Sequence, residues 1–326
     1  MNGTSNTADR IVGCLQGIAT GDAIGKQTET LAYADVRRWY PHGIRGLEGT
    51  PGAVIPRYVG NSKHEWRIGE TTDDTERTIA VARAIIADER VSHASIGREM
   101  LMCKKSVHPG VKSLWEFYQE GDPSRIATRH DGCGAAVRVA PVGIVYRPSA
   151  LDELVNGARE ASISTHGGSL AIAAAAATAA AVSAAIEGVP ACQVLALAER
   201  AAATAERRWP GVSEPAMANA IRSVHDMLAG LAVVEADDVA RRCFPNKPLT
   251  IVPLALGLAT VMRSAESAML LIANVGGDSD SVASIAGAVL GAIYPGTVNR
   301  AWYQVVEDVN RHNLLPLAAQ LSRLRR

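Results

Sequence analysis

Two short acidic segments, far apart in the sequence, carry the side chains best suited to chemistry. Thr72-Asp73-Asp74 stands at one predicted helix start, and Asp278-Ser279-Asp280-Ser281 stands at another, directly after Gly276-Gly277. Each segment offers two carboxylates and at least one hydroxyl group, and neither contains Cys or His. Hard oxygen ligands of this kind suit Mg²⁺, Mn²⁺ or Ca²⁺ rather than Zn²⁺. The segments are therefore candidate halves of a metal site.

Helix capping is the simpler interpretation of either segment taken alone. Asp and Ser are preferred N-cap residues, and a carboxylate in the first turn gains about 0.3–1 kcal/mol from the helix dipole. If the two segments meet in a buried place, however, four carboxylates repel one another, and bound cations would relieve that repulsion. Capping and metal binding both remain open until the two segments are placed relative to each other.

The composition of the 326 residues favours a helical protein with close contacts between helices. Hydrophobic residues make up 48% of the chain but aromatic residues only 4%, so small aliphatic side chains dominate the core. Lys plus Arg and Asp plus Glu number 33 each, which argues against a general nucleic-acid-binding protein. The five cysteines include no CxxC pair, and the polar N-terminus resembles no secretion signal, so we expect a cytoplasmic location.

Hydrophobic spacing predicts one all-α domain over residues 10–326, after a disordered tail at residues 1–9. A first helix from Ile11 is expected to break at Gly21-Asp22. Residues 41–70 are expected to be a long loop, and residues 121–143 a second loop that leads into a helix. The Ala-rich stretch near 170–186 is interpreted as a buried helix, so no membrane association is expected. Beyond the helix that starts near Asp73, the predicted helices cover about residues 94–104, 168–187, 191–207, 214–229, 250–260, 264–274 and 282–293.

Four segments, in order, resemble the ADP-ribosylglycohydrolases, also called ADP-ribosyl-acceptor hydrolases, the group of the dinitrogenase-reductase-activating glycohydrolase. Each segment is a weak signal alone, but together they have family-like spacing and cover nearly the whole chain. The segments are residues 17–25 followed by Glu29, residues 72–75, residues 135–143 and residues 276–281.

This resemblance implies an orthogonal multi-helix bundle with long active-site loops and two Mg²⁺ (or Mn²⁺) ions at the base of an ADP-ribose cleft. The metal ligands it implies are Thr72, Asp73, Asp74, Asp278, Asp280 and Ser281. The substrate-binding residues it implies are Glu29, Asp131, Gly132, Cys133, Gly134, His166 and Gly277. The candidate catalytic residues are Glu29, Asp74 and Asp280.

The chain departs from the family pattern in four places. Ser281 stands where Thr is usual, and the loop Gly132-Cys133-Gly134 often reads Gly-Asn-Gly. Gly167-Gly168-Ser169 replaces a segment that often holds a second His or Asn and a Pro. Glu76-Arg77 places charges where hydrophobic residues or Gln-Met are common. These differences are compatible with a different acceptor.

The function implied is metal-dependent hydrolysis of the bond between ribose C1″ and an N- or O-linked acceptor atom, releasing ADP-ribose. Asp74 or Asp280 is the candidate general base, and Glu29 would orient the substrate or act as the acid. The expected partner is an ADP-ribosylated protein, nucleobase or small molecule, and the expected state is a monomer. Two alternatives stay open, a hydrolase of another ribosyl or ADP-ribose-containing metabolite and a catalytically silent binding protein with the family fold.

Three further assignments are less specific. Asp22 is expected to hold its own tight turn through an Asx contact. Arg138 would face a diphosphate or anchor a local carboxylate. The candidates for stacking on adenine are Trp209, Tyr146 and Tyr58, and the sequence does not choose among them.

Overall fold

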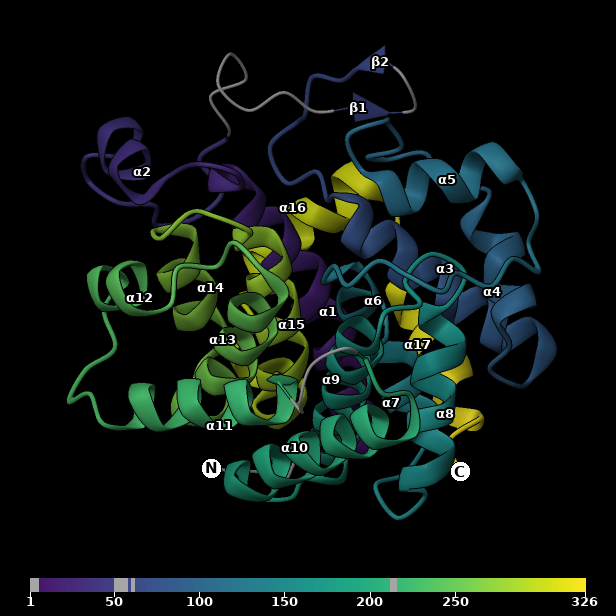
Figure 1. The fold of residues 1–326 in the computed structure, drawn as a ribbon. Coiled ribbons are helices and arrows are strands. Elements are labelled where there is room, and N and C mark those ends of the chain that lie inside the picture. The colour runs from purple at the N-terminus through teal and green to yellow at the C-terminus, as the bar shows by residue number, and fades with distance from the viewer. Residues whose placement is uncertain (1–5, 50–57, 60–61, 212–215) are drawn as a thin grey trace.

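The computed structural model describes residues 6–49, 58–59, 62–211 and 216–326, and these residues form an all-α bundle (Figure 1). The predicted all-α class is confirmed, and the described strands are limited to one short antiparallel hairpin, β1 (Tyr58–Val59) with β2 (Ser62–Lys63). The helices are α1 (Thr7–Gly25), α2 (Tyr33–Trp39), α3 (Asp73–Asp88), α4 (His93–Met100), α5 (Lys112–Glu120), α6 (Gly134–Val137), α7 (Ala140–Val145), α8 (Leu151–Ser162), α9 (Ser169–Glu187), α10 (Ala191–Arg208), α11 (Ala216–Ala229), α12 (Ala236–Arg242), α13 (Pro248–Val261), α14 (Ala265–Ala273), α15 (Ser279–Ile293), α16 (Arg300–Asn310) and α17 (Leu314–Arg323), with the 3-10 helices η1 (Lys26–Thr28) and η2 (Pro295–Thr297).

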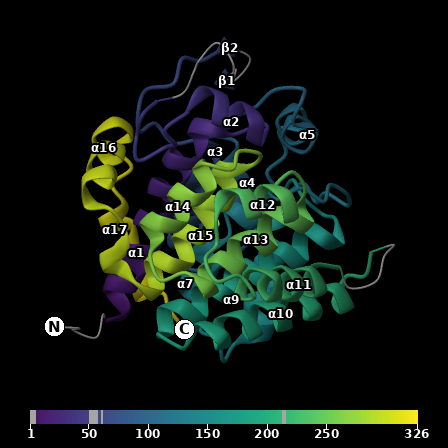
Figure 2. The same ribbon diagram turned by 90° about the vertical axis from the view of Figure 1, so that its left-hand side faces the viewer.

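Helix α9 lies inside the bundle and is covered by α6, α7, α8, α10 and α15 (Figures 1 and 2). By length and composition α9 alone among the described helices is apolar enough to cross a membrane, with a mean hydropathy of 1.9. The chain buries 89% of that stretch among its own helices, however. Alanine suits this position because its small side chain lets neighbouring helices approach on every side, as the sequence predicts.

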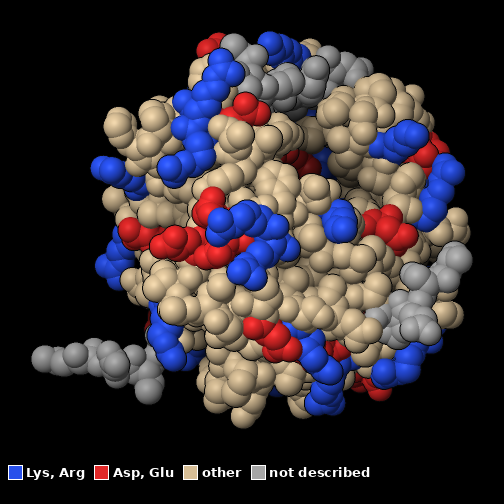
Figure 3. Space-filling model, turned by 60° about the vertical axis from the view of Figure 1, so that its left-hand side comes forward, with Lys and Arg blue, Asp and Glu red and all other residues tan. Residues whose placement is uncertain are grey.

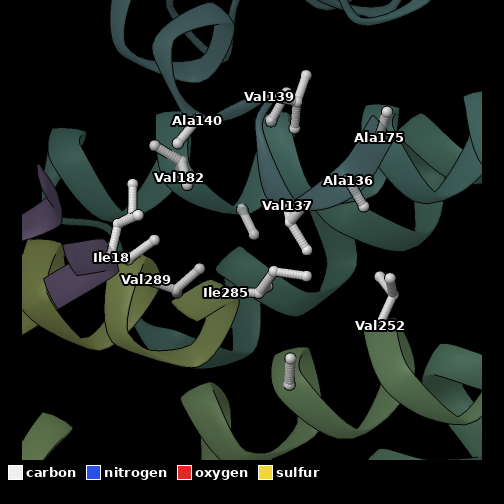
Figure 4. Close-up of a cluster of buried hydrophobic side chains, with 14 of the residues drawn as sticks. Ile18, Ala136, Val137, Val139, Ala140, Ala175, Val182, Val252, Ile285 and Val289 are labelled. Carbon is white, nitrogen blue, oxygen red and sulfur yellow. The ribbon is translucent and has the colours of Figure 1, made fainter. Parts of the chain in front are cut away.

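Side chains from several helices meet in the apolar core beside α9 (Figure 4). Ile18 of α1, Val137 of α6, Val182 of α9 and Ile285 of α15 are all buried there. Fully burying an aliphatic side chain of this size contributes about 1.5–3 kcal/mol. This core fixes α1 and α15 relative to the segments that carry the candidate site.

Helices α1 and α15 run antiparallel in backbone contact. Gly13, Gly17, Gly21 and Gly25 recur every four residues and therefore lie on one face of α1. A methyl group added at any of the four would overlap a backbone oxygen of α15. The oxygens belong, in the same order, to Gly291, Gly287, Ala283 and Ser279. The contact therefore places the C-terminal end of α1 beside the N-terminal end of α15.

Two expectations about the N-terminal region are corrected by this arrangement. Helix α1 continues through Gly21-Asp22 to Gly25, because those glycines are contact positions and not helix breaks. Helix α1 also starts at Thr7, before the expected tail boundary at residue 9, because Asn6 and Asp9 form a reciprocal capping box. Residues 1–5 lie outside the described residues.

Candidate active site

The N-terminal ends of α3 and α15 meet at a cleft of about 500 Å³. The Ser281 hydroxyl on α15 donates a hydrogen bond to Asp74 Oδ2 on α3 over 3.1 Å, and both residues are buried. Five acidic or hydroxyl side chains from the two segments line the cleft, and Glu29 joins them. The five are Asp73, Asp74, Asp278, Asp280 and Ser281. The two acidic segments therefore form one site.

The start of α3 is held by a carboxylate from α1. Thr72 is the N-cap, and its hydroxyl accepts a hydrogen bond from the Asp74 N–H at 3.2 Å. The fully buried Asp22 accepts bonds from the N–H groups of Thr72 at 2.9 Å and Thr75 at 3.1 Å, and from the Thr75 hydroxyl at 2.5 Å. The expected Asx turn at Asp22 is therefore wrong. Asp22 was missed as a site residue because its partners lie 50 residues away.

The start of α15 is shaped by two left-handed glycines. Gly276 has φ +89° and Gly277 has φ +68°, a conformation that favours glycine. Gly277 exchanges backbone hydrogen bonds with the turn at Glu29 and Thr30 and the residue after it, donating to Leu31 O at 2.8 Å and accepting from Thr30 N at 2.7 Å. These bonds hold the segment that contains Glu29 against the N-terminal end of α15, where the acidic residues lie.

The side chains at the start of α15 divide between two neighbours. The Ser279 hydroxyl donates to Gly25 O at 2.8 Å and lies 3.1 Å from the Thr28 hydroxyl, so Ser279 fastens α15 to α1. Ser281 and Asp280 line the cleft instead. Asp278 occupies the N-cap position, yet its side chain makes no capping hydrogen bond. Capping therefore does not explain Asp278.

Negative charge is crowded around Asp74. Its pKa is raised well above the ordinary aspartate range, first by burial and then by the nearby charges of Asp22, Asp278 and Glu29. Oxygen donors crowded in this way suit a hard divalent cation, which would offset both the burial and the repulsion. The chemistry of Asp74, Asp278, Asp280 and Ser281 thus fits a metal site. Among the described residues, no three acidic, His or Cys side chains enclose an ion as they stand.

Asp73, the other expected aspartate ligand on α3, is turned toward a neighbouring cation. Its carboxylate forms an ion pair with Arg77, one helical turn later on the same helix. The second terminal nitrogen of Arg77 donates to Lys105 O at 2.8 Å. Arg77 belongs to the charged pair Glu76-Arg77 that departs from the family pattern, and it lines the cleft.

The glycine loop before α6 lies against His166. A Cβ at Gly132 would stand 3.1 Å from His166 Nε2, and one at Gly134 would stand 2.9 Å from its Cε1. Between these glycines, the Cys133 thiol donates to Asp278 Oδ2 over 3.1 Å. All of these residues line the cleft, as the resemblance implies.

The imidazole of His166 is held neutral by its surroundings. Burial lowers the pKa of His166 well below the ordinary histidine range, and the positive charges of Arg138 and Arg77 lower it further. Its Nδ1 lies 2.7 Å from the Thr165 hydroxyl. A neutral ring offers one N–H donor and one acceptor nitrogen rather than a charge.

Three of the expected site residues do not line the cleft, namely Thr72, Asp131 and Gly277. Thr72 supports α3 as its N-cap, and Gly277 acts through its backbone. Asp131 caps α9, because its Oδ1 accepts bonds from the N–H groups of Leu170 at 2.9 Å and Ala171 at 3.2 Å. All three therefore position neighbours of the cleft.

Arg138 supports the glycine loop from inside the protein. Its buried guanidinium donates to the backbone oxygens of Gly134, Ala161 and Ser162 and to the Thr165 hydroxyl, at 2.9–3.1 Å. Burial lowers its pKa to about 9. No carboxylate among the described residues pairs with it, so the expected carboxylate anchor is not found there, although part of Arg138 does reach the cleft.

Neither of the adenine-stacking candidates whose side chains are described lines the cleft. The Trp209 ring lies beside the guanidinium groups of Arg159 and Arg208, and the Tyr146 ring lies beside Arg326. The third candidate, the Tyr58 side chain, lies outside the described part of the structure. The sequence missed the wall opposite the glycine loop, because it contains no acidic or glycine-rich motif. That wall consists of Ser106, His108, Val111, Ser113 and Leu114.

Comparisons with known proteins bear on this geometry. Residues 3–326 match the sequence model of a family described as ADP-ribosylglycohydrolase. A protein of Archaeoglobus fulgidus is 26% identical, with 95% of each chain covered. The human ADP-ribosylhydrolase ARH3 is 23% identical, with 96% of this chain and 93% of that protein covered. A solved structure titled "ADP-ribosylglycohydrolase-related protein complex" has a TM-score of 0.70 at 24% identity, covers 98% of this chain and 99% of its own, and shows the same fold.

Proposed function

Because the chain belongs to the ADP-ribosylglycohydrolase family, we propose that it hydrolyses the bond between ribose C1″ and the acceptor atom of an ADP-ribosylated substrate. The products are ADP-ribose and the free acceptor. The observation that supports this most strongly is the hydrogen bond from Ser281 to Asp74, which joins the two acidic segments at the base of one cleft.

Asp74, Asp278, Asp280 and Ser281 are the residues that would hold Mg²⁺ or Mn²⁺ in this proposal. When bound, such a cation polarises ribose hydroxyl groups and lowers the pKa of a coordinated water. The second ion that the sequence led us to expect needs Asp73, which is paired with Arg77. We therefore assign only the site around Asp74 to the proposed reaction.

The remaining chemistry belongs to the carboxylates of the chain. Glycoside cleavage passes through an oxocarbenium-like transition state, in which a carboxylate manages the attacking water or the leaving group. We assign Asp74 or Asp280 as the acceptor of the proton from water, because both are buried at the cleft base. Glu29, which lines the same cleft, orients the substrate or donates a proton to the leaving acceptor.

The glycine loop and His166 are proposed to bind the diphosphate. Gly132 and Gly134 leave the backbone of this loop free of side chains next to the cleft. A neutral His166 donates a hydrogen bond without adding a charge. Cys133 takes the position of the frequent family Asn, and its thiol contacts Asp278 instead.

A monomeric state and a cytoplasmic location remain part of the proposal. The described cysteines are all free, and Cys14, Cys103 and Cys243 are buried, which agrees with a reducing compartment. On the face drawn in Figure 3, basic and acidic side chains are interspersed. This distribution agrees with a protein that is not a general nucleic-acid binder.

A substrate panel tests the proposed reaction. Arginine-, serine-, nucleobase- and acyl-linked ADP-ribose are each incubated with the protein and Mg²⁺ or Mn²⁺, and free ADP-ribose is measured. We expect release from at least one class. Release from none, with turnover of another ribosyl metabolite instead, favours the alternative hydrolase. No turnover of any substrate, together with tight ADP-ribose binding, favours the silent binding protein.

Variants of the acidic segments test the assignment of residues. Asp74→Asn and Asp280→Asn should each lower kcat at least about a hundredfold, because each removes a buried charge from the reacting centre. Asp226→Asn, at an exposed aspartate on α11, is the matched control and should retain full activity. Full activity and full metal content in both site variants would refute the assignment.

A further inference from the structure

The pairing of Arg77 with Asp73 changes the number of cations that the site can hold. We infer that the Arg77 guanidinium takes the place of one of the two expected metal ions, so that the cleft binds a single divalent cation. This inference rests on the proposed function only through the metal site, and it concerns binding and not turnover.

The first support is the burial and spacing of the pair. Arg77 lies four residues after Asp73 on α3, so the two side chains lie on the same face of the helix. The Arg77 side chain is 4% exposed and the Asp73 side chain 19% exposed. A buried guanidinium keeps its charge and needs a partner, and Asp73 is that partner. A metal ion at Asp73 would compete with Arg77 for this carboxylate.

The second support is that Arg77 is fixed in place at its other end. Its second terminal nitrogen donates to Lys105 O at 2.8 Å. The neighbouring Glu76 accepts bonds from the N–H groups of Lys104 and Lys105 at 3.0–3.2 Å, so this segment is attached to α3 twice. Arg77 therefore cannot turn away from Asp73 without losing its bond to Lys105 O, next to Ser106 in the wall of the cleft.

The third support is that the neighbouring oxygen donors contact groups other than Arg77. Asp74 makes its contact with Ser281 on α15, and Asp278 accepts a bond from the Cys133 thiol. These groups and Asp280 line the cleft, whereas Asp73 pairs with Arg77. One dication among Asp74, Asp278 and Asp280 offsets the crowding of negative charge, and Arg77 already neutralises Asp73.

A second dication at Asp73 would also lie next to the guanidinium. Like charges that lie close together repel, and the burial of Arg77 strengthens that repulsion. Burial lowers the pKa of Arg77, but a guanidinium keeps its proton at neutral pH, and its charge does not depend on the metal concentration. The cation at Asp73 is thus the Arg77 side chain itself. The cation at Asp74, Asp278 and Asp280 is a metal ion that can dissociate.

Metal counting tests the inference directly. Wild-type protein, Arg77→Met and Arg77→Lys are saturated with Mn²⁺ by equilibrium dialysis, and the bound metal per chain is measured by mass spectrometry. We expect one ion in the wild type, one in Arg77→Lys, which keeps the charge, and two in Arg77→Met, which frees Asp73. Arg83→Met, at an exposed arginine on the same helix, is the matched control and should bind one.

Electron paramagnetic resonance gives a second readout. Two Mn²⁺ ions in a binuclear site lie about 3.5–4 Å apart and give an exchange-coupled spectrum. We expect this spectrum in Arg77→Met and its absence in the wild type. Two ions in the wild type, two in Arg77→Lys, or one in Arg77→Met would each overturn the inference. If Arg77→Met does not fold, the counts for the wild type and Arg77→Lys still decide it.

The proposed function can stand or fall separately from this result. Two coupled ions in an active wild type would overturn the role of Arg77 and leave the hydrolase assignment intact. A single ion without release of ADP-ribose would support the role of Arg77 and contradict the hydrolase. No bound ion in any variant would overturn the inference along with the metal part of the proposed function.

Discussion

Asp22 links the core of the protein to the start of α3. Its carboxylate receives three hydrogen bonds from Thr72 and Thr75, and all of these groups are buried. Two of the donors are backbone N–H groups at the end of a helix, where four such groups lack partners within the helix. Asp22 therefore fixes the first turn of α3, and with it the positions of Asp73 and Asp74.

The variant Asp22→Asn tests this support. One oxygen of the carboxylate becomes an NH₂ group that faces donors, so we expect a loss of about 1–3 kcal/mol in the free energy of unfolding. Denaturant titration measures it, and Thr75→Val, which removes one donor, should cost only about 1 kcal/mol. A loss for Asp22→Asn no larger than that for Thr75→Val would contradict the account.

His312 makes the stability dependent on pH. Burial, followed by the charges of Lys105 and Arg83, lowers its pKa from 6.5 to about 4, and its Nε2 lies 2.9 Å from the Thr71 hydroxyl. The unfolded chain thus binds a proton between these pH values that the folded chain does not. Stability should fall as pH drops from about 6.5 to 4, by at most roughly 3 kcal/mol for this group.

The variant His312→Gln isolates that contribution. His166, whose pKa is also lowered, acts in the same direction and leaves a residual slope in the variant. We expect unfolding free energies measured between pH 4 and pH 7 to change less steeply in His312→Gln than in the wild type. Identical slopes would show that His312 does not titrate as described.

At the level of single residues, the order of the motifs predicted which residues carry the chemistry. It did not predict the contacts that support those residues. Asp74, Asp280 and Ser281 were identifiable because acidic and hydroxyl residues follow one another at two helix starts. The roles of Asp22 and Asp131 as caps were not, because each partner lies on a distant segment. Sequence spacing does not record such contacts.

Among the elements, the antiparallel pair α1 and α15 decides whether the site forms. Backbone contact along the two glycine-rich faces leaves no room for a side chain. The same contact sets the end of α1, and hence Glu29, beside Asp278. An alanine in the middle of this contact should therefore affect both stability and activity.

The variant Gly17→Ala tests how strictly the contact between α1 and α15 excludes a side chain. Its methyl group would overlap Gly287 O, so we expect a loss of about 3 kcal/mol in the free energy of unfolding, together with lower metal affinity. Gly296→Ala is the control, because nothing lies within 4 Å of the added methyl group, and should change stability by less than about 0.5 kcal/mol. Equal effects in the two variants would contradict the contact.

The helices divide into those that the sequence predicts and those that it does not. Long periodic segments such as α9, α10 and α13 are predicted to within about two residues of their observed bounds. Polar amphipathic helices such as α8 and α16 were not predicted. Short helices such as α5 were missed because too few residues repeat, and the wall of the cleft opposite the glycine loop was missed with α5.

Over the whole molecule, one apolar core connects helices from α1 to α17. This supports our proposal of a single domain over residues 10–326. In a single domain, the binding of a ligand at the cleft changes the stability of the entire fold. A cation that binds only the folded chain stabilises it by mass action. At a hundredfold excess over Kd the gain is about 2.7 kcal/mol.

Calorimetry with and without metal tests this coupling. We expect Mn²⁺ or Mg²⁺ to raise Tm by several degrees relative to protein in EDTA, at roughly 2–4 °C per kcal/mol. Asp280→Asn should lose most of the shift, whereas Asp226→Asn should keep it. An equal shift in wild type and Asp280→Asn would place the ion elsewhere.

A crystal structure of the protein with Mn²⁺ and ADP-ribose would show whether the acidic segments bind metal beside the substrate, because anomalous scattering locates the metal independently of its ligands. We expect one manganese peak coordinated by Asp74 and Asp280, with the distal ribose of ADP-ribose beside it and the diphosphate against the glycine loop at Gly132–Gly134. ADP-ribose bound outside this cleft, or manganese coordinated by neither aspartate, would contradict it.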